Sequence, residues 1–597
     1  MELPITPLVV TVLLLVPLTL YILQRPIPSI PHAPWAVLTT DLPALIAHPT
    51  TGFAYLKSLP TTHQTPLRQV WLKPFSRPYL LLADYREARD ILTRRREWDR
   101  SDYSISILGG VAPRHHINLK HGPAWRYHRA LLADTMAPAF LHAVAAPEIY
   151  RSATALVTLW RLKADRAAGA PFEAGGDISR TALDAVLDFT FGKAFPHRTL
   201  PAQTRAAETA EAKGGGGGGP VERGPRGDAV FPQGAMHETL EATLHAGELV
   251  GRAAATPFID LAYRYFALLP SERRFRALQR GYAREQILSA VERLDKVRGT
   301  SHGGDDDDSW ARSAVDLMMA RERRLAGKEG RAPVYVSEDT SDEVLGFIVA
   351  GHDTTATMLS WGLKRLTDAP AAQVSLRAAL RGAHAAAAAA GRAPTVAEIV
   401  TTSVPYLDGV LEEMVRLGTP VPVLERHVPY LDGVLEEMVR LGTPVPVLER
   451  QCDRDTTVLG RAVPKGTTML MLAQGPSLTS PALRIPEAAR SPSARPCGEW
   501  DPEGMELFVP ERWLSTDGAG NVVFDPLAGP VLGFGGGVRG CFGRKLAYLE
   551  MRIVCTLIAW DFELLECGEE LSGYEATEEI TYKPTSCYVK PRRWEDA

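Results

Sequence analysis

"GFGGGVRGCFGRKLAYLEMR" is the sequence of residues 533–552, and it places Cys541 among six glycines. Glycine permits tight turns and a close approach of the backbone to a ligand. The residues that follow Cys541 predict a helix, whose free N–H groups and partial positive charge favour a thiolate over a thiol. A free cysteine is most often a buried structural residue. This loop instead indicates an exposed sulfur anion held close to a large, flat group.

Five positions of the loop match a known motif: Phe534, Gly537, Arg539, Cys541 and Gly543. Together they resemble the haem-binding signature of the cytochromes P450. The resemblance implies that Cys541 is the thiolate ligand of haem b (iron protoporphyrin IX), pushing electron density toward the iron. It also implies that Phe534 packs against the ligand loop and that Arg539 pairs with a haem propionate. Backbone N–H groups of the loop, which includes Gly537 and Gly543, would tune the sulfur.

A second motif, AGHDTT at residues 350–355, resembles the oxygen-binding helix of the same family. Ala350 and Thr354 are four residues apart and therefore share one helix face. A threonine hydroxyl that bonds to the carbonyl four residues earlier can bend a helix and open a groove. The resemblance implies that Asp353 and Thr354 relay protons to bound O2.

Two further patterns resemble the contacts of the family with the haem propionates. Trp125 and Arg129 are also four residues apart on one helix face. An arginine follows PVPVLE in each copy of a repeat, at Arg426 and Arg450. We favour Arg450 as the propionate partner, for the reason given next.

The repeat consists of residues 404–426 and residues 428–450, which are identical. Two copies do not form a solenoid, so a recent duplication or an error in the gene model explains them better. Whether the duplication leaves the protein active stays open. The second copy runs directly into strand-like sequence after residue 450, whereas the first runs into another helix. We therefore expect the second copy to form the core and the first to lie in a loop, where insertions are tolerated.

Each copy holds a Glu-x-x-Arg pair, Glu413 with Arg416 and Glu437 with Arg440. Residues three apart meet on one helix face. Such a pair is usually solvated, but the family resemblance implies a buried ionic triad that includes an arginine of the FVPERW segment. We expect the triad to be Glu437, Arg440 and Arg512.

Composition excludes several classes of protein. The 597 residues carry a net charge of −4, which gives no general argument for binding nucleic acid. The six cysteines contain no C-x-x-C pair, which argues against a disulfide scaffold or a zinc site and indicates a cytosol-facing protein.

The N-terminus predicts a membrane anchor. Residues 5–23 are apolar, and as a helix they would span roughly 28 Å, about one hydrocarbon core. A cleaved signal peptide is the alternative, but the preceding residues include Glu2 and no lysine or arginine. Four prolines then predict a stiff hinge. We assign residues 1–24 to the anchor, 25–34 to the hinge and 35–597 to one haem-thiolate catalytic domain.

The predicted fold is mostly α with minor β, the cytochrome P450 fold preceded by a single N-terminal transmembrane helix. Helical patterns dominate residues 149–364, and short strand-like segments gather after residue 445. The glycine run at residues 214–219 and the acidic tract at residues 305–308 have no means of burying surface, so we expect surface insertions.

The implied activity is a monooxygenase that inserts one oxygen atom of O2 into a small hydrophobic substrate. Electrons would come from NADPH through NADPH-cytochrome P450 reductase, and Arg126, Arg129, Arg544 and Lys545 would form a basic docking patch. The expected location is the endoplasmic reticulum membrane, single-pass, with the catalytic domain facing the cytosol. Two alternatives remain, a reductase-independent thiolate-haem isomerase or dehydratase, and a non-catalytic haem binder. The substrate itself is not encoded in any motif.

Deleting residues 1–25 should leave a haem-containing protein that no longer sediments with membranes, because the apolar run is lost. Sedimentation after a carbonate wash measures this. A truncated chain that stays as membrane-bound as the full chain would show that the run is not the main anchor.

Overall fold

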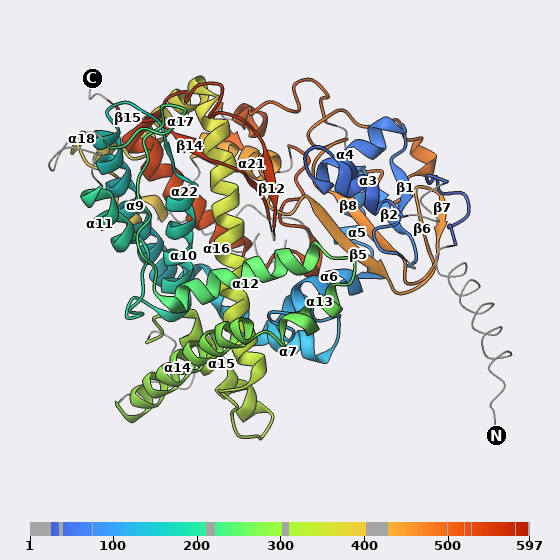
Figure 1. Cartoon of the computed structure of the whole chain (residues 1–597), viewed down its shortest axis with the longest axis horizontal. Helices are drawn as coiled ribbons and strands as arrows, with labels where there is room; N and C mark the ends of the chain where they lie inside the picture. Colours follow the sequence, from blue (N-terminus) through green and yellow to red (C-terminus); the bar gives the residue numbers. More distant parts are fainter. Residues whose placement is uncertain are drawn as a thin grey trace.

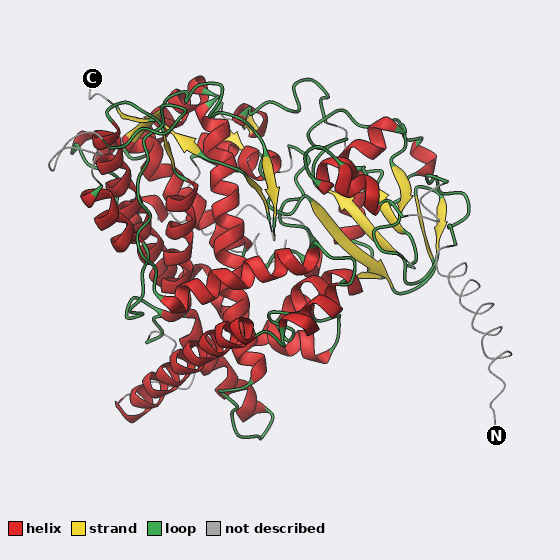
Figure 2. Cartoon of the chain, viewed as in Figure 1, coloured by secondary structure: helices red, strands yellow, loops and turns green. Residues whose placement is uncertain are grey.

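The computed structural model describes residues 25–34, 40–74, 76–210, 221–300, 310–400, 428–497, 500–518, 520–526, 528–579 and 581–594. Helices dominate, and the strands form small sheets (Figures 1 and 2). The predicted class, mostly α with minor β, is therefore confirmed. The apolar run at residues 5–23 and the first copy of the repeat lie outside the described residues.

The search for membrane spans covers the described residues alone. Among them, no single helix has both the length and the apolar character to cross a bilayer. One bent pair, Pro123–Met136 with Pro138–Ala167, meets the criterion by length and composition. The predicted N-terminal anchor remains a prediction.

The α-helices are α3 (Leu42–Ala47), α4 (Gly52–Thr62), α5 (Tyr85–Thr93), α6 (Asp102–Gly109), α7 (Pro123–Leu132), α8 (Pro138–Phe140), α9 (Ala146–Ala167), α10 (Gly175–Phe191), α11 (Leu200–Thr209), α12 (Glu238–Ala254), α13 (Ile259–Phe266), α14 (Pro270–Thr300), α15 (Ala314–Lys328), α16 (Glu338–Thr367), α17 (Pro370–Ala383), α18 (Ala385–Ala389), α19 (Val396–Val400), α21 (Pro429–Leu441) and α22 (Arg544–Asp561). The strands are β1 (Leu67–Val70), β2 (Tyr79–Leu82), β3 (Trp98–Asp99), β4 (Phe172–Glu173), β5 (Val447–Cys452), β6 (Thr456–Val458), β7 (Arg461–Val463), β8 (Thr468–Leu472), β9 (Leu514–Thr516), β10 (Val522–Phe524), β11 (Phe562–Leu564), β12 (Ala576–Glu578), β13 (Tyr582–Pro584), β14 (Tyr588–Val589) and β15 (Pro591–Arg593). Short turns are η1 (His116–Asn118), η2 (Ala133–Met136), η3 (Leu141–Ala145), η4 (Glu487–Ala489), η5 (Pro510–Trp513) and η6 (Gly537–Arg539).

The largest sheet has the order β1-β2-β8-β5-β3 and lies apart from the main group of helices (Figure 1). β2 and β8 are parallel, with Leu81 opposite Leu470, and the other pairs are antiparallel. The alternating side chains of these strands enter two separate apolar clusters, one on each face. The sheet thus joins the first hundred residues to the segment after the repeat.

The main core is helical and centres on α16, which runs through the middle of Figure 1. α16 begins with a capping box, in which Ser337 and Thr340 each accept a hydrogen bond from the backbone N–H of the other. It packs against α10, and α9 packs against α22. Every residue of α22 from Tyr548 to Ala559 is buried, as expected of a helix surrounded by the core on all sides.

The Glu437–Arg440 pair of the second repeat copy lies on α21 and is fully buried. Arg440 donates to Glu437 through Nε at 2.8 Å and Nη2 at 2.6 Å, and both side chains are 0% exposed. Arg440 also donates to the carbonyls of Leu478 (3.1 Å) and Leu507 (3.0 Å). The pair therefore fixes the loops on both sides of residue 490 to α21.

The third member of this network differs from the predicted one. Trp513 Nε1 donates to Glu437 Oε1 at 3.0 Å, while the Arg512 guanidinium donates to the carbonyls of Glu503 (3.4 Å) and Gly504. Successive residues of a 3₁₀ turn point about 120° apart, so η5 directs Trp513 rather than Arg512 at Glu437. The assignment of Arg512 to the triad is wrong.

Residues 476–497 pack on α5. Arg490 donates to Asp84 at 2.6 Å, with both side chains 2% exposed, and Arg86 pairs with Glu487 at 2.7 Å.

The two repeat copies should respond differently to the same substitution. Glu437→Ala or Arg440→Ala leaves a buried charge unpaired, which typically costs about 3–5 kcal/mol, so stable haem incorporation should be lost. Glu413→Ala and Arg416→Ala serve as matched controls and should cost at most about 1 kcal/mol if that pair is at the surface. Haem content per chain measures the effect. Loss of haem in the Glu413 and Arg416 variants, with normal haem content in the Glu437 and Arg440 variants, would contradict the assignment of the second copy to the core.

Candidate functional site

The loop before α22 has a tightly determined backbone. The Cys541 N–H donates to the carbonyl of Phe534 at 2.9 Å, which closes the loop around the turn η6. Gly537 has φ +63°, and a Cβ there would lie 2.5 Å from the Leu92 carbonyl oxygen. Gly537 therefore cannot be replaced without moving this loop or α5.

Cys541 combines an interior position with an accessible side chain. Burial raises the pKa of its thiol above the ordinary value of 9.0, while the Gly543 and Arg544 N–H groups and the charges of Arg544 and Arg129 oppose this rise. In the protein alone, burial outweighs the influence of the helix N-terminus on this thiol. A metal ion bound to the sulfur would lower the pKa of the thiol and stabilise the thiolate.

The predicted propionate contacts lie together beside the loop. The Arg539 guanidinium lies 5.2 Å from the Trp125 ring centroid, and the Arg129 guanidinium lies 4.4 Å from that of Phe542. Arg450 lies on β5 and donates through Nη2 to the Arg539 carbonyl at 3.5 Å. Residues more than 400 positions apart thus meet at one place.

This cluster holds an excess of buried positive charge. Burial, with repulsion by Arg100, lowers the pKa of Arg450 to about 9 and that of Arg539 to about 10. Asp99 lies 3.5 Å from Arg539 Nε and offsets part of the charge. No sequence motif identified Arg100. It directly follows the two-residue strand β3, and the pairing of β3 with β5 brings it close to Arg450.

The residues present fit a haem group. Among the described residues, Nη1 of Arg539 is buried and has no hydrogen-bond partner. Buried donors are nearly always paired, so this nitrogen fits a site where a bound acidic group accepts the hydrogen bond. A Cβ on Gly543 would meet nothing within 4 Å, so open space adjoins the Cys541 loop. A sulfur ligand, open space beside it and surplus guanidinium groups match the thiolate ligation and the propionates of haem.

The AGHDTT motif lies in the middle of α16. Residues on either side of it are buried, whereas Ala350 is exposed and Asp353 and Thr354 are partly exposed. Thr354 Oγ1 donates to the Ala350 carbonyl at 2.7 Å, as expected. Asp353 accepts a hydrogen bond from Thr581 Oγ1 at 2.8 Å. Thr581 lies before β13 in a segment that carried no recognisable motif.

Comparison with known proteins agrees with this geometry. The family profile described as Cytochrome P450 matches residues 265–428, 425–477 and 501–590. The chain belongs to the cytochrome P450 family. It is 35% identical to the cytochrome P450 monooxygenase TRI13 of Fusarium sporotrichioides, over 95% of each chain. It is 32% identical to the cytochrome P450 monooxygenase GME11363 of Pestalotiopsis microspora, over 90% of this chain and 88% of that one.

The fold is also that of the cytochromes P450. The crystal structure of the cytochrome P450DA heme domain superimposes with a TM-score of 0.61 at 18% identity, covering 96% of this chain and 98% of that one. The chain is a P450 monooxygenase and, as in its family, binds haem through a cysteine thiolate. The roles of the individual site residues remain predictions.

The predicted basic docking patch of this P450 is only partly at the surface. Arg126 is exposed, whereas Arg129 and Arg544 are only partly exposed, and burial is the largest influence on the pKa of each. The Arg129 guanidinium lies 4.4 Å from the ring centroid of Phe542, and that of Arg544 lies 5.3 Å from the ring centroid of Tyr548. The four-residue docking patch stays a prediction.

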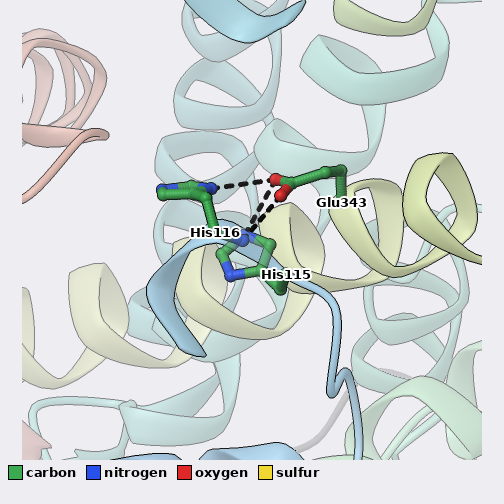
Figure 3. Close-up of side chains that lie close together, drawn as sticks. All are labelled: His115, His116 and Glu343. Atoms are coloured by element: carbon green, nitrogen blue, oxygen red, sulfur yellow. Dashed lines mark hydrogen bonds and ion pairs between the residues drawn. The ribbon is translucent and has the colours of Figure 1, made fainter. Parts of the chain in front are cut away.

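A buried cluster around Glu343 was not found from the sequence (Figure 3). Glu343 Oε1 accepts from the His116 N–H (2.6 Å) and His128 Nδ1 (2.7 Å). Glu343 Oε2 faces His116 Nδ1 (2.9 Å) and His115 Nε2 (3.4 Å). The adjacent pair His115–His116 was the available signal, but its partner is more than 200 residues away. Both carboxylate oxygens are satisfied, so the cluster is explained without a bound ion.

The cluster joins three parts of the haem site. Glu343 lies on α16, His128 on α7 beside Arg129, and the ring of His116 is 5.5 Å from that of Phe542. Burial lowers the pKa of His115 to about 3. Although burial alone would raise it, the charges of His115 and His116 hold the pKa of Glu343 well below its usual range. The carboxylate therefore stays ionised and holds α7 and η1 against α16.

Replacing Glu343 should destabilise this P450. In Glu343→Gln an amide N–H₂ meets imidazole donors, so the free energy of unfolding should fall by about 3 kcal/mol, and haem retention should fall with it. The Glu343 pKa is lowered in the folded state, so its contribution is complete above the ordinary carboxyl pKa of 4.5 and is lost as the pH falls. The difference in the free energy of unfolding between wild type and Glu343→Gln should therefore decrease below about pH 4.5.

Glu338→Gln is the matched control, because Glu338 lies on the same helix and pairs with Arg114 at 2.8 Å at the surface. It should cost less than about 1 kcal/mol. Denaturant unfolding of both variants at several pH values decides the matter. Equal effects of the two substitutions would contradict the proposed role of the cluster.

Proposed function

We propose that this P450 inserts one oxygen atom of O2 into a small hydrophobic substrate and that it receives electrons from NADPH through NADPH-cytochrome P450 reductase. We further propose that residues 1–24 anchor it in the endoplasmic reticulum membrane, with the catalytic domain in the cytosol. The apolar run at residues 5–23 and the proline-rich hinge support the location.

The observation that carries the activity is the contact of the Cys541 loop with α16, where the ring centroid of Phe542 lies 6.0 Å from that of Phe347. The accessible residues of α16, Ala350, Asp353 and Thr354, follow Phe347 and are called the accessible strip below. Cys541 is exposed on one element, and Ala350 is exposed within a helix that is otherwise buried around it. Arg129, Arg450 and Arg539 supply the charges that would hold the haem propionates. Haem bound through this thiolate supplies the electron push that favours O–O cleavage.

The polar residues of α16 supply the protons in this proposal. Thr354 donates its hydroxyl proton to the Ala350 carbonyl, so its oxygen can still accept a hydrogen bond. Asp353 lies beside it, and its carboxylate is linked to Thr581, which in turn bonds Thr357 at 2.9 Å. Rotation of Asp353 between Thr581 and the strip would let it pick up and release a proton. The acid-threonine pair favours oxygenation over the isomerase alternative.

Two measurements test the proposal. The reduced carbon monoxide difference spectrum reports a folded thiolate haem, and its absence would leave a dead or non-catalytic chain. Turnover of extracted metabolites with NADPH and the reductase then tests oxygenation. Product formed without reductase would contradict the proposed electron path and favour the isomerase or dehydratase alternative.

Thr354→Ala should retain haem and substrate binding but form about tenfold less product per NADPH, since the hydroxyl that positions the proton relay is lost. The product-to-NADPH ratio measures this. Thr354→Ser keeps the hydroxyl and should restore most of the ratio. An unchanged ratio in the alanine variant would rule out the proton role of Thr354.

A further inference from the structure

One face of α16 is bonded to the hairpin formed by β12 and β13. Asp353, Thr357 and Trp361 lie four residues apart along the helix and therefore share that face. Thr581, which directly precedes β13, donates through Oγ1 to Asp353 Oδ2 at 2.8 Å and lies 2.9 Å from Thr357 Oγ1. The indole N–H of Trp361 donates to the carbonyl of Tyr582 at 2.8 Å. The hairpin therefore has a fixed position along the turns of α16 that follow the accessible strip.

The two hydroxyl groups of this contact lie in the interior, whereas the carboxyl group is within reach of water. Thr357 is 3% exposed and Thr581 is 2% exposed, while Asp353 is partly exposed. A buried hydroxyl that loses its hydrogen-bond partner is costly. Any change in the charge of Asp353 must therefore leave both threonines with partners.

The direction of each hydrogen bond is determined when Asp353 is ionised. A carboxylate only accepts hydrogen bonds, so Thr581 uses its one hydroxyl proton on Asp353. Thr581 then accepts the proton of Thr357. The bonds run from Thr357 through Thr581 to Asp353.

A protonated Asp353 fits the same positions with both bonds reversed. The carboxyl O–H donates to Thr581, which turns its own proton to Thr357. Thr357 can then donate to the carbonyl four residues earlier, an acceptor that threonine and serine use within helices. Thr354 and Ser360 of α16 make such bonds, at 2.7 Å and 2.8 Å. Asp353 can therefore gain or lose a proton while every buried hydroxyl keeps a partner.

Attachment of the hairpin does not by itself explain the Thr581 hydroxyl. Tyr582, the next residue, already holds the hairpin in place: its carbonyl accepts from Trp361, and its N–H donates to the Pro444 carbonyl at 2.9 Å. Its ring centroid also lies 5.2 Å from that of Phe53. None of these contacts uses the Thr581 hydroxyl, so the bonds to Asp353 and to the helix need another reason.

We propose that Thr581 and Thr357 form a reversible hydrogen-bond chain that positions Asp353 for proton transfer. The proposal rests on the proposed function, in which Asp353 and Thr354 supply protons at the accessible strip. Asp353 takes one proton from water and releases it at the strip. No proton passes through the threonines, because each hydroxyl keeps its own and only turns it. Thr581 and Thr357 act through Asp353 and are positioning residues rather than catalytic ones.

Thr581→Val tests the chain, because valine has nearly the shape of threonine and lacks the hydroxyl. The variant should bind haem and give a normal reduced carbon monoxide absorption band. With the reductase and extracted metabolites it should form about tenfold less product per NADPH. The ratio of the rates in H₂O and D₂O should rise, since proton transfer then limits the reaction. Thr581→Ser keeps the hydroxyl and should restore both values.

A second measurement does not depend on turnover. The infrared C–O stretch of carbon monoxide bound to the reduced haem responds to charges and hydrogen-bond donors near it. Asp353→Asn, which removes the carboxylate, should shift this band. Thr581→Val should shift it too, because the carboxylate is no longer held, whereas Thr581→Ser should leave it in place. Thr357→Val keeps the bond from Thr581 to the ionised carboxylate but blocks the reversal, so it should lower product per NADPH without moving the band.

Thr577→Val is the matched control. Thr577 lies on β12 of the same hairpin, and its hydroxyl group is 3.2 Å from that of Thr585 at the surface. This variant should keep the wild-type product ratio, isotope ratio and infrared band. Equal effects of Thr577→Val and Thr581→Val would overturn the proposal. So would a Thr581→Val band at the wild-type position when Asp353→Asn moves it. If the wild type forms no product, the proposed activity fails, and the infrared comparison alone decides whether Thr581 positions Asp353.

Discussion

The structure depends on holding one sulfur at a fixed place between helices that come from distant parts of the chain. Cys541 sits at the end of a loop with a constrained backbone and immediately before α22. α22 is located by α9 and by the buried pair that joins it to α21. α21 in turn anchors the preceding loops through Glu437 and Arg440. Displacement of any of these elements would move the sulfur.

The second physical theme is buried positive charge. Guanidinium groups of Arg129, Arg450 and Arg539 enter the site from α7, from β5 and from the cysteine loop. Burial of several cations without equal acidic partners is unfavourable unless a ligand supplies the missing charge. The propionates of haem would do so. Folding and cofactor binding are therefore coupled in this protein, because a bound partner stabilises only the state that binds it.

Histidine and carboxylate groups connect α16 to neighbouring segments. The Glu343 cluster binds α7 and η1 to α16, so the helix that carries Arg129 and the helix that carries Thr354 share one buried anchor. Asp353 is linked to the C-terminal segment through Thr581. The likeness to a solved P450 structure at 18% identity indicates that the overall arrangement tolerates extensive sequence change.

Local patterns in the sequence were enough to predict the family, the Cys541 loop, the Thr354 hydrogen bond to Ala350 and the choice of the second Glu-x-x-Arg pair. Each of these depends on residues within about one helical turn or one loop, where spacing determines geometry. Contacts between segments hundreds of residues apart had no such signal. Only the tertiary structure selected Trp513 over Arg512 as the partner of Glu437, because the orientation of a turn against α21 decides which side chain faces it.

The same reason explains the Glu343 cluster, the position of Arg100 and the high pKa of the Cys541 thiol. All three depend on how many atoms from other elements surround a group, and burial of that kind is not a property of the neighbouring sequence. The sequence specified which groups would carry the chemistry. Packing decided which charges face one another and how strongly each is held.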